Sequence, residues 1–590
     1  MSGFATLPFE AQAAQIAALI SSGGDPRALL REAGALPDAE PLGLLLDALT
    51  QRQRVDAALE TELSAIFEAL SDAALQHMLT RESTVECTGL LERLGRDALL
   101  RWPIARISAL AFAARWLRRR APGVYGRLVA QAEARLAGPL DDGRWLLFAS
   151  GARLAALAAD SRSSELVREA THAAIDALAR APKSISQANA ERLLAARVYA
   201  NPGHFFFELL QNADDAGATR WAVSIEAERV SVRHDGAPFS LLDLVGLLSI
   251  GQTTKSAAQI GFFGVGFKSV YEICERPRVH SGALDFEIAH VSIPRALAEQ
   301  TARDEGETLL VLPYSGPARV DVLHARALAI PPETLLTLRH VRDVEVRDAR
   351  GGATRWRLAR EGACDVLRSE GQARRYRLAA REVRFAGPRE DGRARETVVR
   401  VAVAIDGHGS PAPVAGATLY AFLPTAERTG LRVLVHAGFD VTLDRERLEL
   451  GSSWNDALLE AAGAALAEVI ALLASEGHDV LTVLSGSAEL APSMAPLAAS
   501  MIAGLSAAHC LRGASGERLV PPRARILDGL LARALAGVDL GDGDRALARR
   551  ANLRRRVTGA VPLGATRRGR CAPRVARRRR ARGDRGCAAR

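Results

Sequence analysis

The segment from residue 204 to residue 313 constrains the fold most strongly, because helical and strand patterns alternate within it over short distances. A helix begins in FFELLQNADDAGATRW, after the breaker Asn201-Pro202-Gly203. The stretches RWAVSIE and RVSVRHD follow as two short strands separated by two residues, which predicts a hairpin. A short helix SLLDLVGLLSI, a glycine-rich loop and the strand ETLLVLP complete the segment. This alternation favours an α/β sandwich with a largely antiparallel sheet.

Changes of composition divide the 590 residues into five predicted parts. Residues 1–182 carry apolar residues at helical spacing and predict a helical domain. Residues 183–324 hold the α/β sandwich, and residues 325–480 predict a second α/β domain of successive strands closed by a long helix. We expect residues 481–548 to be mostly helical. Residues 549–590 form an arginine-rich tail without apolar periodicity, which predicts disorder.

The net charge of +9 comes from this tail. Residues 549–590 contain sixteen arginines and one acid, whereas the remaining residues hold 61 basic and 67 acidic side chains. The body is therefore mildly acidic. The tail either binds nucleic acid or is not native, as a shifted reading frame in an arginine-rich coding region would produce. We expect a nucleic-acid partner only if the tail is native.

Cysteine and lysine usage add two constraints. The six cysteines show neither metal-ligand nor disulfide spacing, which favours a reducing, cytoplasmic setting. We expect no signal peptide, and no membrane span because charges interrupt the apolar runs before about 18 residues. The only lysines are Lys183, Lys255 and Lys268, so a retained lysine indicates a place that needs a compact ammonium. Two of the three lie in the glycine-rich segment.

The helix after Gly203 carries a polar row. Glu208 and Asn212 are four residues apart, and Asp215 is seven from Glu208, so all three fall on one helix face. Mg²⁺ accepts few protein oxygens and keeps water, so a carboxamide oxygen is a suitable anchor. A neighbouring carboxylate could deprotonate an attacking water. The alternative is a solvent-exposed polar face.

Three further motifs surround this helix in the sequence. In RHDGAPF, Asp235 could accept a hydrogen bond from an adenine amino group and Gly236 leaves room for the base, although an ordinary turn has the same residues. In IGFFGVGFKS, glycines would let backbone amides approach phosphates, and Lys268 could add a point charge. This loop matches neither the Walker A pattern nor the dinucleotide fingerprint. Thr308 begins the strand of GETLLVLP.

In this order, the four motifs resemble those of the GHKL (Bergerat-fold) ATPases. ELLQNADDA is similar to their first motif, and GFFGVGFKSVY to the third motif of the heat shock protein 90 class. The chain resembles the sacsin-type branch most, through its ELIQNADDAGAT-like signature. The resemblance covers about residues 185 to 480, because LRHVRDVEVRD, AFLPT and HAGFDVTLDRERL continue it.

The resemblance implies a Bergerat-type sandwich over residues 183–324, a transducer-like domain over residues 325–480, and ATP with Mg²⁺ as ligands. Glu208 would be the general base, Asn212 would bind Mg²⁺, and Asp215 would support the adenine side. Thr308 would reach adenine through water, and Arg445 would reach the γ-phosphate. Lys255 would lie on a lid, with the phosphate loop and lid hinge formed by Gly261, Phe262, Gly264, Val265, Gly266, Phe267 and Lys268.

One position departs from the family pattern. The second motif of these ATPases reads Asp-x-Gly, but here the first position is His234, and Asp235 directly precedes Gly236. Either the turn is shifted so that Asp235 contacts adenine, or His234 takes that role.

The implied function is a cytoplasmic, ATP-binding and ATP-hydrolysing protein that is chaperone-like, with protein clients as partners. Nucleotide would close a lid and move the second domain. The alternative is a nucleotide-gated interaction module in a nucleic-acid-processing or defence assembly, with little turnover. A histidine kinase is disfavoured, since no phosphoacceptor-histidine helix precedes the ATP motifs.

Overall fold

The structure is a computed structural model, and it describes most of the chain up to residue 548. The described residues are 4–36, 40–51, 57–70, 75, 78, 85–138, 143–180, 204–248, 266–298, 303–304, 306–316, 320–385, 395–414, 417–442, 447–480, 483, 492–506, 508–512, 518–520, 525–527 and 546–548.

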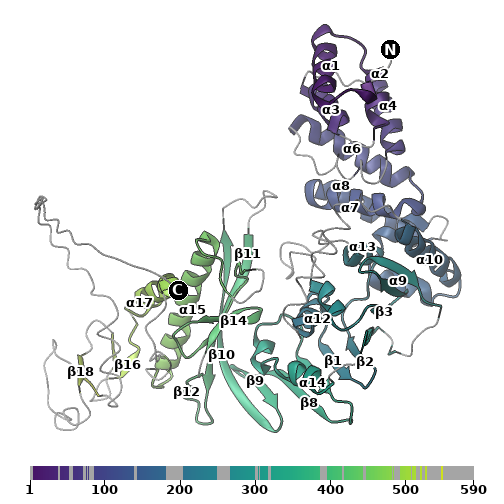
Figure 1. Cartoon of the computed structure of the whole chain (residues 1–590). Coiled ribbons are helices and arrows are strands. Elements are labelled where there is room, and N and C mark those ends of the chain that lie inside the picture. Colours follow the sequence, from purple (N-terminus) through teal and green to yellow (C-terminus); the bar gives the residue numbers. More distant parts are fainter. Residues whose placement is uncertain are drawn as a thin grey trace, which may run out of the picture.

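The N-terminal part is helical, as the apolar spacing predicts. Its helices stack at the top of Figure 1, and their apolar faces form a core that includes Leu45, Leu110 and Leu154. The helices are α1 (Phe9–Ser22), α2 (Arg27–Gly34), α3 (Glu40–Gln51), α4 (Ala57–Ala69), α6 (Val85–Arg101), α7 (Ile107–Arg120), α8 (Pro122–Leu136), α9 (Gly151–Ala159) and α10 (Ser164–Arg180).

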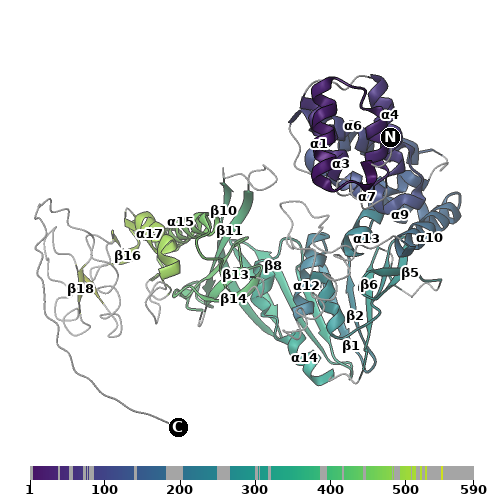
Figure 2. The ribbon, with the colours of Figure 1, turned by 45° about the horizontal axis from the view of Figure 1, so that its top comes forward.

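One mixed, mostly antiparallel sheet runs through the rest of the structure, in the order β14-β13-β15-β11-β10-β9-β8-β7-β1-β2-β6-β3-β4-β5, with β12 paired to β11. Figure 2 shows it continuing from the teal strands near the helical part into the green strands. The strands are β1 (Arg220–Ile225), β2 (Arg229–His234), β3 (Arg278–Ser281), β4 (Leu284–Ala289), β5 (Ile293–Ala296), β6 (Thr308–Pro313), β7 (Asp343–Arg347), β8 (Ala353–Glu361), β9 (Cys364–Ser369), β10 (Gln372–Phe385), β11 (Arg395–Ile405), β12 (Pro411–Ala412), β13 (Thr418–Ala421), β14 (Leu423–Arg428) and β15 (Leu434–His436).

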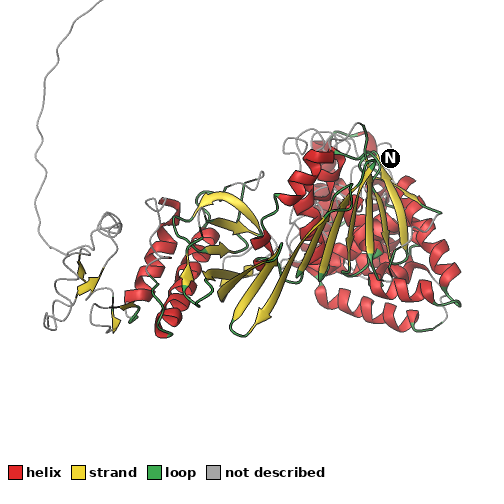
Figure 3. Ribbon diagram, turned by 90° about the horizontal axis from the view of Figure 1, so that it is seen from below, coloured by secondary structure: helices red, strands yellow, loops and turns green. Residues whose placement is uncertain are grey.

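The predicted hairpin is confirmed, and a parallel pair extends the sheet beyond it. β1 and β2 pair antiparallel, with Trp221 opposite His234. On its other side β1 pairs in parallel with β7, with Trp221 opposite Val344. The sheet therefore passes without a break from the segment 204–313 into the strands that follow it. Figure 3 shows these strands in front, with helices behind the part near the N-terminus.

The segment 204–336 also supplies the short helices near the sheet. These are α12 (His204–Asp215), α13 (Leu241–Leu248), α14 (Val320–Leu328), and the 3₁₀ turns η4 (Gly266–Glu272) and η5 (Pro332–Leu336). The sequence LLTLRHVRDVEVRD is strand only in its second half, as β7, because Leu335 and Leu336 close the turn η5.

Two apolar cores lie along the sheet. The larger core joins the N-terminal helices to β1–β4 and includes Phe205, Trp221 and Phe286. The smaller core lies under α15 (Ser453–Ser475), which packs on β10, β11 and α17 (Ala495–Ser506). By length and composition alone α15 could cross a membrane, but 61% of its apolar window is buried in the protein, as in a core helix.

The expectation that the stretch 481–548 is mostly helical stays a prediction, because the structure describes less than half of it. Its described residues contain α17 and the short strands β16 (Leu511–Arg512), β17 (Arg518–Leu519), β18 (Arg525–Leu527) and β19 (Ala546–Ala548). Two-residue pairing between β16 and β17 brings Leu511 and Leu519 together in the smaller core.

Candidate functional site

The helix α12 carries Glu208, Asn212 and Asp215, as the sequence predicts. Its apolar side is anchored by Phe205 and Phe206, which are fully buried with ring centroids 4.1 Å apart. The Glu208 side chain is also buried, with 4% exposed, whereas Asn212 and Asp215 are half-buried. The row is therefore not the solvent-exposed polar face of the alternative interpretation. A carboxylate that is held inside a protein requires polar surroundings.

Asp214, a residue that the sequence reasoning missed, connects α12 to the segment before β7. Its fully buried carboxylate accepts hydrogen bonds from the backbone N–H groups of Arg339 (3.0 Å), His340 (2.7 Å) and Val341 (2.9 Å). Three donors on one carboxylate fix the end of the helix against a segment 125 residues away in the sequence. The doubled aspartate in NADDA is the only local signal, and it does not say which of the two is buried.

The turn after β2 packs directly on the C-terminal end of α12. The Ala237 N–H donates to the Ala216 carbonyl at 2.8 Å. A Cβ added to Gly236 would lie 3.0 Å from the Ala216 carbonyl oxygen and 3.1 Å from the Ala218 nitrogen. A side chain at position 236 would therefore pack tightly against the backbone of residues 216 and 218.

Asp235 ties this turn to the start of β1. Its carboxylate accepts from the Thr219 backbone N–H (2.7 Å) and hydroxyl (2.7 Å), and from the Arg220 backbone N–H (2.8 Å) and Nε (3.3 Å). Burial acts to raise the pKa of Asp235, but the hydrogen bonds from Thr219 and Arg220 outweigh it and hold that pKa below its usual value. The Asp235 carboxylate therefore already has four hydrogen bonds to Thr219 and Arg220, which hold the turn to β1. An adenine contact by Asp235 stays a prediction.

His234 is the other candidate at this turn, and it lies on the core face of the sheet. It shares that face of β2 with the buried residues Val230 and Val232. The Gly236 N–H donates to His234 Nδ1 at 3.2 Å. Burial lowers the pKa of His234 to about 4, against the opposing charge of Asp235, so the ring is neutral at pH 7.

Polar side chains continue in register across the neighbouring strands. Thr308 lies opposite His234, and Ser281 lies opposite Thr308. Both side chains are fully buried, and their hydroxyl oxygens are 2.6 Å apart. The Phe239 N–H donates to the Ser281 hydroxyl at 2.9 Å. We call His234, Thr308 and Ser281 the polar row; Ser281 is the member that the sequence reasoning missed.

Part of the predicted phosphate loop can be placed. Gly266 begins η4, Phe267 is buried, and the buried Lys268 donates from Nζ to the Val291 carbonyl at 2.5 Å. Val291 itself has φ of 70°, which is unfavourable for a β-branched residue. Lys268 thus connects the end of the loop to the β4–β5 turn. The remaining predicted residues, Lys255, Gly261, Phe262, Gly264, Val265 and Arg445, lie outside the described part of the chain.

The N-terminal helices contact the site region through backbone packing. The helix α9 begins at Gly151, capped by Ser150, which accepts from the Arg153 N–H. A Cβ added to Gly151 would lie 1.7 Å from the Pro238 carbonyl oxygen, so glycine is required there. The turn that carries His234 and Gly236 is therefore held between α9 and α12.

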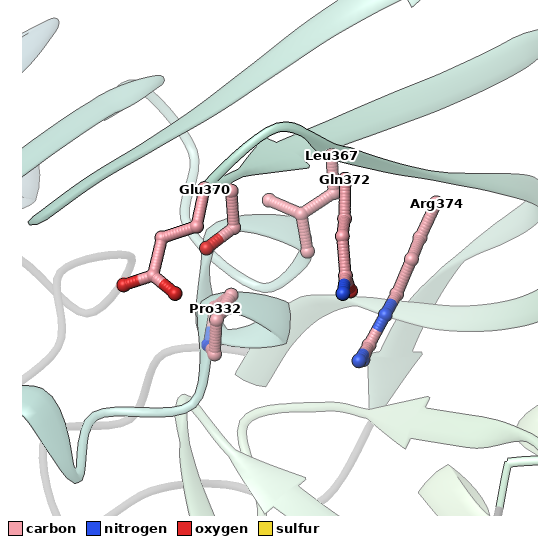
Figure 4. A pocket seen from close by; sticks show the side chains of 6 residues that line it. Pro332, Leu367, Glu370, Gln372 and Arg374 are labelled. Carbon is pink, nitrogen blue, oxygen red and sulfur yellow. The ribbon is translucent and has the colours of Figure 1, made fainter.

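Two other findings concern ligands. Among the described residues, no group of three or more His, Cys, Asp or Glu side chains is arranged to hold a metal ion, so a metal here would need ligands other than such a cluster. A cavity of about 200 Å³ lies where η5 meets β9 and β10. Its described lining includes none of the predicted site residues (Figure 4): Pro332, Leu367, Ser369, Glu370, Gln372 and Arg374.

Comparison with known proteins supports a sacsin-like family for the region around α12. Residues 193–292 match the sacsin domain. The chain is 24% identical to protein NO VEIN of Arabidopsis thaliana over 402 residues, which are 58% of this chain and 15% of that protein. It is 32% identical to sacsin of Homo sapiens over 104 residues, which are 14% of this chain and 2% of sacsin. The chain thus spans a small part of these relatives' length.

A solved structure also aligns with part of the chain. It is the N-terminal domain of a DNA repair protein, with 14% identity and a TM-score of 0.28, and the match covers 44% of this chain and 92% of that domain. A similarity of this size carries no argument about fold or function.

Proposed function

We propose that this chain binds ATP together with Mg²⁺ in a Bergerat-type site formed by α12, the polar row and the glycine-rich segment that precedes η4. One observation carries the proposal: the buried polar row ends at the turn that packs on α12. Ala237 bonds to Ala216, only four residues after Asn212. In this arrangement, side chains that could contact adenine (His234 and Thr308) and a side chain that could hold metal-bound phosphates (Asn212) would lie at one end of the sheet. The match of residues 193–292 to the sacsin domain adds support.

The residues of α12 would supply the chemistry of hydrolysis. Glu208 would take a proton from the attacking water, and its burial strengthens its interactions by excluding bulk solvent. Asn212 would offer one carboxamide oxygen to the metal ion, in keeping with the preference of Mg²⁺ for few protein ligands. When bound, Mg²⁺ would neutralise charge on the phosphates. Asp215 and Thr308 would support the adenine ring. Lys268 and Arg445 would interact with the phosphates.

The biological output that we propose is chaperone-like remodelling of protein clients in the cytoplasm. Asp214 supports coupling between the site and the second part of the sheet, because it fixes α12 to residues 339–341, directly before β7. A movement of α12 on nucleotide binding would therefore act on β7 and the strands that follow it. Such coupling requires that ATP favours one arrangement of the two parts over the other.

The proposal is tested by replacing Glu208 in the full chain. We expect Glu208→Ala to retain Mg·ATP binding and to lower kcat of ATP hydrolysis by roughly 10²- to 10⁴-fold, because only the proton acceptor is removed. Binding is measured by calorimetry and turnover by phosphate release. The matched control is Glu228→Ala, an exposed glutamate in the β1–β2 turn, which should leave both quantities unchanged. Unchanged turnover in Glu208→Ala would refute the assignment of Glu208 as the general base.

A second function is favoured by the packing of α9 on the turn beside the polar row. Because Gly151 touches the Pro238 backbone, occupancy of the site could be transmitted to the N-terminal helices without hydrolysis. The chain would then be a nucleotide-gated interaction module, and nucleic acid would be a partner only through a native arginine-rich tail. Tight Mg·ATP binding without measurable phosphate release by the wild-type chain would select this function over the first.

A further inference from the structure

The cavity between η5 and the hairpin of β9 and β10 is a second candidate binding site, and we call it the hairpin pocket (Figure 4). None of its six lining residues belongs to the proposed nucleotide site. Its volume of about 200 Å³ is below the roughly 300–1,000 Å³ of pockets that hold drug-sized ligands. The hairpin pocket therefore suits a small ligand, of about the size of one amino acid.

The strand register places four of the lining residues in one block. Ser369 pairs with Gln372, and Leu367 pairs with Arg374. Residues two apart on a strand point to the same face, so a hydroxyl, a carboxamide and a guanidinium share one face of the hairpin with Leu367. Leu367 is buried, with 2% exposed, and Pro332 lines the pocket from η5. The pocket thus combines an apolar base with polar groups around it.

Glu370 has a backbone conformation that the turn itself does not favour for glutamate. Glu370 and Gly371 join β9 to β10, with φ of 47° and 77°. Two-residue turns with positive φ at both positions strongly prefer Asn, Asp or Gly. Residues in such unfavourable conformations concentrate at functional sites. The Thr354 hydroxyl donates to Glu370 Oε1 at 3.3 Å, and a carboxylate can accept further hydrogen bonds from a ligand.

Arg374 is held in place by Glu333. Its Nη1 donates to Glu333 Oε1 at 2.6 Å, and the hydroxyl of the buried Tyr376 donates to the same oxygen at 3.2 Å. The bond to Glu333 uses one of the five N–H donors of the guanidinium. The other donors can bind a ligand carboxylate, for which the planar guanidinium is well suited.

We propose that the hairpin pocket binds a free α-amino acid with an aliphatic side chain, such as leucine. Figure 4 shows Glu370 at one side of the pocket and Arg374 at the other, with Leu367 and Gln372 between them. Arg374 and Gln372 would bind the ligand carboxylate, and Glu370 would bind its ammonium group. The aliphatic side chain would contact Leu367 and Pro332. The charged lining groups are one carboxylate and one guanidinium, which a zwitterion complements with its two opposite charges.

The experiment titrates L-leucine into the full chain by calorimetry at pH 7, up to millimolar concentrations. Leucinamide lacks the carboxylate and N-acetyl-leucine lacks the ammonium group, so each should bind roughly 5- to 10-fold more weakly than leucine. Absence of leucine binding overturns the proposal. Equal binding of N-acetyl-leucine would indicate the carboxyl terminus of a peptide as the ligand and would also overturn it. Neither result affects the proposed nucleotide site, which is tested with Mg·ATP.

A variant of Glu370 separates a role in binding from a role in the turn. Glu370→Asn suits the positive φ, so it should raise the melting temperature while it raises the leucine Kd by roughly 5- to 10-fold. The matched control Glu382→Gln removes one negative charge from an exposed position of β10 outside the pocket and should leave the leucine Kd unchanged. An unchanged Kd in Glu370→Asn, or a lower melting temperature, overturns the assignment of Glu370 to the ligand.

Discussion

Replacement of Asp214 with asparagine should uncouple α12 from the segment before β7. The substitution keeps the size of the side chain and removes its charge. In the wild type, Oδ1 accepts from the His340 and Val341 N–H groups, and Oδ2 accepts from the Arg339 N–H. An asparagine can place its single oxygen towards two of these donors at most. Its amino group then faces the third N–H, donor against donor.

The expected cost follows from these contacts. One hydrogen bond to a charged acceptor is lost and two are weakened, and each such bond contributes about 1.5–3 kcal/mol. The site is fully buried, so water cannot replace the missing acceptor without movement of the segment. We therefore expect the free energy of unfolding to fall by about 2–4 kcal/mol.

Urea denaturation and amide hydrogen exchange measure this effect. The amides of Arg339, His340 and Val341 should exchange faster in Asp214→Asn, together with those of β7. The matched control is Asp176→Asn in α10, which removes the same charge at an exposed position and should change stability by less than about 0.5 kcal/mol. If Asp214→Asn is as stable as this control, with unchanged exchange at residues 339–341, the carboxylate does not join the two parts and the reasoning is refuted.

Two further predictions concern packing and pH. Gly151→Ala should destabilise the contact between α9 and the turn after β2 by at least about 1–3 kcal/mol, because its Cβ would overlap the Pro238 carbonyl oxygen. The matched control Gly126→Ala meets no atom within 4 Å and should be neutral or stabilising, so equal melting temperatures in the two variants would contradict the packing. The pKa of Asp235 is held below its usual value in the folded protein. The ionised Asp235 carboxylate therefore stabilises the fold fully above about pH 3.9, and this stabilisation is lost as the pH falls through the folded pKa. The stability difference between wild type and Asp235→Asn should therefore be largest near neutral pH and shrink below about pH 3.9, and a difference that grows in acid would contradict the hydrogen bonds to Thr219 and Arg220.

Local patterns in the sequence were sufficient for much of the fold. Period-two alternation with a two-residue separation predicted β1 and β2, and the structure pairs them with Trp221 opposite His234. Helical spacing predicted α12 and α15, and Ser452 caps α15 by accepting from the Asn455 N–H. These features depend on residues within a few positions of one another, which is the range over which side-chain periodicity and capping act.

The role of each polar residue was decided by tertiary structure. The sequence placed Asp214 and Asp215 side by side, but only the approach of residues 339–341 makes Asp214 the buried acceptor. The sequence also left His234 and Asp235 as equal candidates at the turn. Partners from Thr219 and Arg220 occupy Asp235, and the strand alternation turns His234 to the core face beside Thr308.

The sequence by itself therefore determined the order of the motifs, the helix that carries Glu208 and Asn212, and the mostly antiparallel character of the sheet. Tertiary structure alone decided that β1 pairs in parallel with β7, that Gly151 touches Pro238, and that Lys268 bonds to Val291. The physical reason is separation along the chain. A hydrogen bond or a close backbone contact depends on where the partner is brought by the fold, and no local pattern specifies a partner that lies tens of residues away.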